Sequence, residues 1–143
     1  MAVTIGDAIE SIESVLDGLP QDWYEEGVPT FETLHMTGGV LQPYFVVSYG
    51  DVIQQGSTAV AGTRGDDHVL PVRFMAVAPT AKIARQLRVK LTDAFTGFTP
   101  DHCGEMTKRG GGGTYTVTNA NDVIVAYVAP VNFRTTINLD VAV

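Results

Sequence analysis

One short cluster contains the residue types of a thiol nucleophile and its base, because Asp101, His102 and Cys103 follow one another. A nucleophilic cysteine needs an imidazole within hydrogen-bond reach. Sequence neighbours rarely achieve that geometry, although His35 or His68 could approach the thiol in the folded chain. We therefore predict a loop thiol without a catalytic role.

A second charged stretch combines a short recognition motif with metal-ligand residue types. Arg64, Gly65 and Asp66 match the integrin-binding tripeptide, but a charged loop tip accounts for so short a match. Asp66, Asp67 and His68 offer carboxylate and imidazole ligands. Neighbouring side chains of an extended strand point to opposite faces, and no second cluster accompanies these three. We assign no metal.

The glycine-rich segment 108–114 (KRGGGGT) has some features of a phosphate-binding loop. It lacks the lysine and Ser/Thr that follow the glycines in such loops, and it precedes a strand-like run instead of a helix. We predict a hairpin loop in which Lys108 and Arg109 could contact a partner. No serine nucleophile motif or paired-carboxylate signature stands out, so we predict no enzyme active site and no cofactor.

Two helices are expected to support the fold. In residues 4–18, apolar side chains recur at helical spacing and the carboxylates fall on the other side, with Thr4 as a candidate cap. Residues 80–98 have the same pattern with a basic outer face, into which Val89 projects. Between residues 20 and 42 we expect an irregular connection with one short strand around residues 32–36.

Strand-like runs account for most of the remaining chain. Because it cannot donate to a ladder, Pro71 is expected at an edge or near the start of its strand. The connection 50–67 is longer than most loops in compact domains and is a candidate functional loop. The last run alternates apolar and polar residues, as expected for a strand with one buried face. The expected strands are residues 43–49, 68–78, 115–118, 123–129 and 132–143, with a turn at 119–122.

These elements predict one α+β domain over residues 1–143. We expect a mostly antiparallel sheet of about four to five strands with two main helices packed on one face. The 45% hydrophobic and 17% charged content fits a globular domain and disfavours a disordered chain. The N-terminal residues do not resemble a signal peptide, no apolar run is long enough to span a bilayer, and the chain has a single cysteine, so we expect a cytosolic product.

Charge is distributed unevenly along the chain. Residues 1–63 contain nine acidic residues and no Lys or Arg, whereas residues 64–143 contain nine basic and seven acidic residues. Such asymmetry can serve intramolecular pairing, subunit docking or an acidic surface that faces DNA, and it equally fits a solvated helix face. A basic footprint for gripping nucleic acid is absent from the sequence.

The central block of the chain resembles the tail terminator family of long-tailed (siphovirus) bacteriophages. The resemblance lies in the aromatic-rich run PYFVVSY, the long loop, the run HVLPVRFMAVA and the amphipathic segment TAKIARQLRVKLTDAF. The matching segments are 43–47, 71–78 and 80–91. In that family a helix precedes a mostly antiparallel sheet, and a second helix follows the central strand pair.

The resemblance implies a non-enzymatic structural protein of the virion. It would form a homohexameric ring that caps the head-proximal end of the tail tube, ends tube polymerisation and provides the surface for head-tail joining. Its partners would be copies of itself, the tail tube protein and a head-completion or connector protein, with DNA passing through the lumen without specific binding. It would be found in the host cytoplasm during assembly. A head-tail connector and a small-ligand-binding or enzymatic α+β module remain alternatives.

Two sets of residues are candidates for these contacts. We expect the acidic face of the first helix to meet the basic face of the second, within or between subunits, or acidic groups to line the lumen. The subunit-interface candidates are Glu10, Glu13, Asp17, Lys82, Arg85, Val89 and Lys90. The candidates for docking to the tube or neck are Asp51, Gln54, Gln55, Arg64, Asp66, Asp67, Lys108 and Arg109.

Overall fold

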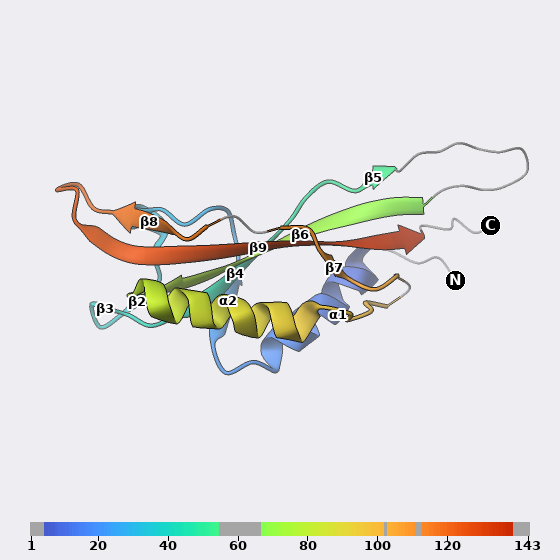
Figure 1. The fold of residues 1–143 in the computed structure, drawn as a ribbon, viewed down its shortest axis with the longest axis horizontal. Coiled ribbons are helices and arrows are strands. Elements are labelled where there is room, and N and C mark those ends of the chain that lie inside the picture. Colours follow the sequence, from blue (N-terminus) through green and yellow to red (C-terminus); the bar gives the residue numbers. More distant parts are fainter. Residues whose placement is uncertain (1–4, 55–66, 102, 111–112, 139–143) are drawn as a thin grey trace, which may run out of the picture.

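A computed structural model describes residues 5–54, 67–101, 103–110 and 113–138 (Figure 1). The elements in chain order are α1 (Ile5–Asp17), β1 (Asp22–Glu25), the 3-10 helix η1 (Phe31–Thr33), β2 (Met36–Thr37), β3 (Val40–Leu41), β4 (Tyr44–Tyr49), β5 (Ile53–Gln54), β6 (Asp67–Ala78), α2 (Ala81–Phe95), β7 (Thr107–Lys108), β8 (Tyr115–Thr118) and β9 (Ile124–Asn138).

The predicted α+β class is confirmed. The path through the main sheet is β1-β4-β6-β9-β7, with β5 added to β6 and β8 added to β9, while β2 and β3 form a separate hairpin. Every described pairing is antiparallel except that of β1 with β4. The long β6 and β9 pair along the whole of β6, so these two strands form the centre of the sheet.

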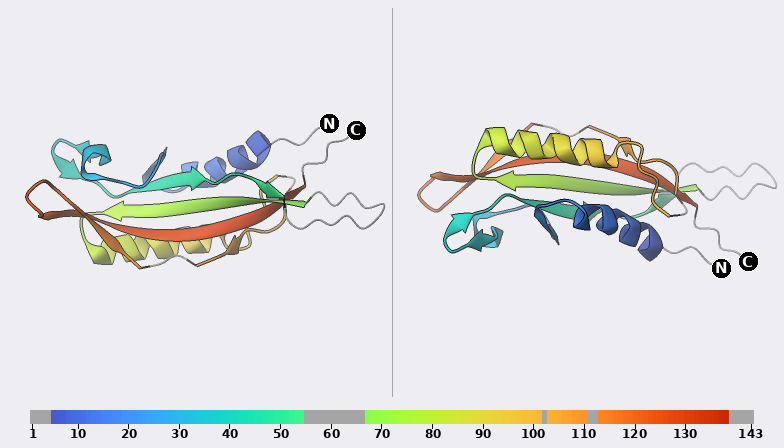
Figure 2. Two further views of the ribbon diagram at one scale, coloured as in Figure 1. Left: turned by 90° about the horizontal axis from the view of Figure 1, so that it is seen from above. Right: turned by 90° about the horizontal axis from the view of Figure 1, so that it is seen from below.

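Both helices pack on one face of the sheet, as predicted, and lie side by side there (Figure 2). α1 lies on the side of β1 and β4, and α2 lies on β6 and β9. The buried stripe of α1 is Ala8, Ile12 and Leu16, and α2 buries Ala84, Leu87, Leu91 and Phe95. The Thr80 side chain caps α2 by accepting a hydrogen bond from the Ile83 amide at 3.2 Å. Among the described residues, no helix is long and apolar enough to cross a bilayer.

The opposite face of the sheet is apolar over one half and polar over the other. In the apolar half, Val46, Met75 and Val128 form a second buried cluster, against which Leu34 and Tyr115 pack. Further along the same strands, residues of this face change to Ser48, Arg73, Asn132 and Arg134. The alternation of side chains between faces brings these polar residues together.

The C-terminal run differs from the prediction, because β9 is one strand of 15 residues where two were expected. Pro130 lies inside it, opposite Met75 of β6, and does not interrupt the pairing with β6. The predicted burial alternation is confirmed over residues 131–137, where odd-numbered positions are buried and even-numbered positions are half-buried or exposed. The predicted turn at 119–122 is confirmed, because Asn119 Oδ1 accepts hydrogen bonds from the amides of Asn121 and Val123.

Pro71 lies near the start of β6, at a break in the neighbouring strand. Tyr49 ends β4 opposite Val72, and Ile53 begins β5 opposite Val69, so no β4 or β5 residue pairs with Pro71. The Gly50 amide donates to the Pro71 carbonyl at 2.9 Å. The ring without an N–H is therefore tolerated where the ladder is already interrupted.

Residues 20–42 contain more regular structure than predicted. The expected strand at 32–36 is wrong, because residues 31–33 form η1 and Leu34 and His35 belong to no strand. The pairing of β1 with β4 was missed because Asp22–Glu25 (DWYE) is short and carries a carboxylate at each end. Tertiary pairing overrides weak local preference here.

Candidate functional site

The fold places opposite charges on opposite sides of the molecule. α1 carries four carboxylates and no basic residue, and the neighbouring edge strand β1 adds two more. α2 carries four basic residues and one carboxylate, and it lies on the β9 side of the sheet. We call the first surface the acidic edge (Glu10, Glu13, Asp17, Asp22 and Glu25) and the second the basic edge (Lys82, Arg85, Lys90 and Lys108). The charge asymmetry of the sequence is thus an asymmetry in space (Figure 2).

The acidic interface candidates lie close enough together to affect one another. The Tyr49 hydroxyl donates to Glu13 Oε2 at 3.4 Å, and the Trp23 indole N–H donates to Asp17 Oδ1 at 2.8 Å. Partial burial raises the pKa of Glu13, and the nearby carboxylates of Glu25, Asp17 and Glu10 raise it further. The acidic edge therefore holds mutual repulsion that a cationic partner would relieve.

The basic candidates project from the outer side of α2. Lys82, Arg85 and Val89 are exposed and Lys90 is half-buried, with 57% of Val89 accessible. Within the described residues, no salt bridge joins these three cations to the three carboxylate candidates of α1. The two candidate surfaces are consequently both available to another molecule.

Only part of the predicted docking set falls on described residues. Gln55, Arg64 and Asp66 lie outside them, and Gln54 and Asp67 are placed only as backbone in β5 and β6. The predicted loop 50–67 is shorter than expected at its N-terminal side, because β5 pairs with β6. The remaining docking candidates, Asp51, Lys108 and Arg109, are exposed, with Lys108 in β7 and Arg109 directly after it.

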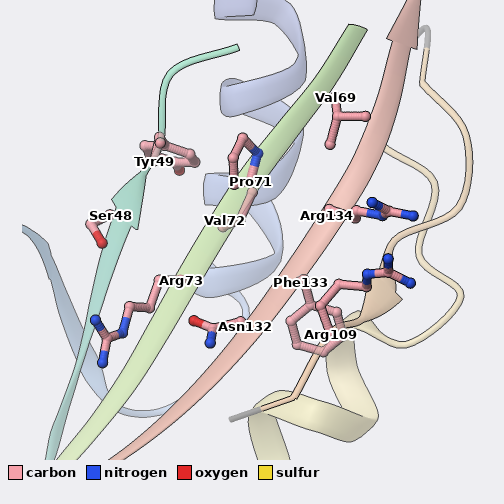
Figure 3. Close-up of a pocket in the computed structure, with 11 residues that line it drawn as sticks. Ser48, Tyr49, Val69, Pro71, Val72, Arg73, Arg109, Asn132, Phe133 and Arg134 are labelled. Atoms are coloured by element: carbon pink, nitrogen blue, oxygen red, sulfur yellow. The ribbon is translucent and has the colours of Figure 1, made fainter. Parts of the chain in front are cut away.

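A hollow of about 540 Å³ lies on the polar half of the face opposite the helices (Figure 3). Arg73, Arg109 and Arg134 reach it from three different segments, together with Ser48 and Asn132. Val69, Pro71, Val72 and Phe133 also line it, and the residues that line it include no carboxylate. Sequence reasoning identified Arg109 alone. The signal for the others was the alternation in β6 and β9, which puts Arg73 and Arg134 on the same face.

The Cys103 thiol does not have the environment of an activated nucleophile. It is half-buried and donates to the Asp101 carbonyl at 3.4 Å. Burial raises its pKa, and the Asp101 carboxylate also raises it, so the reactive thiolate is disfavoured. His102 lies outside the described residues.

An aromatic cluster that the sequence did not reveal fixes the connection after β1. The ring of His35 stacks on Tyr24 with centroids 3.6 Å apart, meets Tyr44 edge-on and contacts Glu26 Oε1 through Nε2. Burial is the main reason that the pKa of Tyr44 is raised to about 12. Tyr44 is buried while Tyr24 and His35 are half-buried, and the mutual ring packing has the features of a structural anchor.

Exposed apolar side chains gather at one end of the sheet, away from β5. The β2–β3 hairpin and the β8–β9 turn both lie at this end (Figure 1). They expose Met36, Val40, Val123 and Ile124, each by 46% or more. Exposed apolar side chains at the end of a sheet are candidates for contact sites.

No protein-family model matches the chain, and no curated protein matches it significantly.

Proposed function

We propose that the protein is a tail terminator of a long-tailed bacteriophage, a non-enzymatic virion component that forms a ring on the head-proximal end of the tail tube. The ring ends tube polymerisation and presents a surface for head docking. The resemblance of residues 43–98 motivates this function, and the separation of charge between the two edges of the sheet is the observation that carries it.

A ring requires two different surfaces that fit each other on successive subunits. Head-to-tail contacts of this kind close into rings when the rotation between subunits allows it. The acidic and basic edges fit this requirement, because they lie towards opposite edges of the sheet and carry opposite charge. Charge complementarity also sets the register of such a contact and disfavours pairing of like edges.

A terminator also needs contacts on its two axial faces. The exposed apolar residues Met36, Val40, Val123 and Ile124 supply one candidate docking surface at one end of the sheet. The predicted docking segment 50–67 enters and leaves the sheet through β5 and β6 at the other end. A deletion that tests this segment should be confined to residues 55–66, because removing β5 would also remove its pairing with β6.

The mass of the assembled protein tests the proposal. We expect native mass spectrometry to find a closed ring of six 15.3 kDa chains, alone or with purified tail tube protein. Replacing Arg85 and Lys90 by Glu should dissociate the ring. Adding Glu10→Lys and Glu25→Lys should restore it, because both carboxylates are exposed on the acidic edge and the edges then carry exchanged charges.

Three results would count against the proposal or its interface. A chain that stays monomeric alone and with tube protein would overturn the terminator function. An intact hexamer in the Arg85→Glu, Lys90→Glu variant would exclude the proposed contact between edges. A ring that binds a connector protein but never the tube would favour the alternative head-tail connector.

A further inference from the structure

We propose that the polar half of the open sheet face binds the phosphate backbone of duplex DNA through Arg73, Arg109 and Arg134. This site lies on the face opposite the helices and goes beyond the proposed ring, in which DNA passes without specific contact. It does not depend on ring formation, because all three arginines belong to one chain.

The three cations are drawn together by the fold and not by the sequence. Arg73 lies in β6, Arg134 lies in β9, and Arg109 follows β7, whose pairing with β9 places Thr107 opposite Arg134. The Arg109 amide donates to the Asn132 carbonyl at 2.7 Å, and the Asn132 amide donates to the Gly110 carbonyl at 3.0 Å. These two backbone hydrogen bonds fix Arg109 beside the hollow.

The arginines have no carboxylate partner in the described part of the chain. No Asp or Glu lines the hollow, and no salt bridge is formed by the three guanidinium groups within the described residues. Arg73 Nε is buried and has no hydrogen-bond partner there. In a chain of net charge -7, an acid-free surface with three arginines is an unusual local concentration of positive charge. Such a surface favours an anionic ligand.

The placement of the side chains favours an extended polyanion over a single small anion. Figure 3 shows Arg109 and Arg134 side by side on one side of the hollow, whereas the Arg73 side chain points the other way, towards β4. A single phosphate group binds best where cations converge on it. Cations on both sides of a polar surface instead match successive phosphates of a nucleic-acid backbone.

The hollow lacks the features that would favour a single strand or an acidic peptide. Phe133 is buried, with 1% of its surface accessible, and Tyr49 packs on the helix side, where its hydroxyl binds Glu13 of α1. Neither ring therefore provides a platform on which unpaired bases could stack. A peptide commonly binds a sheet by pairing with a free strand edge. The hollow instead lies over β6 and β9, which pair with each other. These arguments favour a ligand whose backbone phosphates contact the arginines and whose bases are not recognised.

Fluorescence anisotropy with a labelled 20-base-pair duplex tests the proposal, using the full chain between 50 and 200 mM salt. Three phosphate contacts predict a slope of log K against log[salt] of about −2.7, which is about a 40-fold loss of affinity over this range. The Arg109→Gln, Arg134→Gln variant should have a slope of about −0.9. The control is Arg88→Gln, which removes a charge from α2 on the other face of the sheet and should leave the slope unchanged.

Several results would overturn the proposal. Absence of binding at 50 mM salt would reject it, as would an equal change of slope in the Arg88→Gln control. Poly-glutamate and unlabelled duplex can be compared as competitors of the labelled duplex at equal concentrations of negative charge. If poly-glutamate competes equally well, the ligand is an acidic polypeptide. Inorganic phosphate that displaces the duplex at millimolar concentration would identify a small-anion site. The ring assay is a separate measurement, so each proposal can fail alone.

Discussion

Replacing Phe95 by Ala should destabilise the packing of α2 on the sheet more than any exposed substitution in that helix. Phe95 is completely buried, and its ring stacks on Phe74 of β6 with centroids 4.2 Å apart. It also meets Phe98 edge-on at 6.0 Å and Phe133 of β9 at 6.3 Å. One side chain thus joins α2 to both central strands.

The magnitude follows from the burial of that ring. Truncating a fully buried Phe to Ala typically costs about 3–5 kcal/mol, because the apolar transfer energy is lost and a cavity remains. The loss of the stacked aromatic pair places the expected value towards the upper part of this range. With an unfolding entropy of roughly 2.1 cal/mol/K per residue, 143 residues give about 3 °C per kcal/mol. For a cost of about 4–5 kcal/mol, the expected fall in Tm is about 13–17 °C.

Urea unfolding followed by circular dichroism, together with a thermal scan, measures this change. Phe95→Leu should lose less stability than Phe95→Ala, because it keeps most of the apolar volume. Val89→Ala serves as the control on the same helix, since the valine is 57% exposed, and it should change stability by less than about 0.5 kcal/mol. A loss below about 1 kcal/mol for Phe95→Ala would refute the reasoning that α2 is held by this aromatic contact.

Two further predictions concern Gly50, which lies beside Pro71, and Glu13 of the acidic edge. Gly50→Ala should lower the free energy of unfolding by about 1–3 kcal/mol, since the added Cβ would lie 2.9 Å from the Pro71 ring. Gly27→Ala is the control and should be neutral, because the space around Gly27 is open. Equal urea midpoints for the two variants would contradict the predicted clash at Gly50. Glu13→Gln should stabilise the chain at pH 7 by less than about 1 kcal/mol after allowance for solvent screening. The pKa of Glu13 is raised on folding, so wild-type stability falls as the pH rises through that pKa, and the difference should vanish below pH 4 in urea titrations. A pH-independent difference would rule this out.

The parts of the fold that the sequence predicts well are those with strong periodicity. The helix near residues 80–98 is recognisable because its apolar residues recur every three to four positions and Thr80 caps it. The strands over residues 43–49, 68–78 and 115–118 correspond to β4, β6 and β8 within one residue at each end. A strand buried on one face alternates apolar and polar residues, and a strand buried on both faces is a continuous apolar run, so both are visible in the sequence.

Elements stabilised by distant pairing were missed or misplaced. β1 has only four residues and is held by β4, 22 positions later in the chain. β9 continues through Pro130 because β6 pairs with it on both sides of that residue. Local sequence carries little information about such pairing, since the stabilising partner is remote.

The sequence by itself determined the α+β class, the two amphipathic helices and an acidic first half without a single Lys or Arg. Only the tertiary structure decided where those charges lie. The order β1-β4-β6-β9-β7 puts the acidic helix and the basic helix on the same face of one sheet but towards its opposite edges. The same pairing gathers Arg73, Arg109 and Arg134, which are 36 and 25 positions apart in the chain, around one hollow. Strand register brings these residues together, and register is a property of the folded sheet.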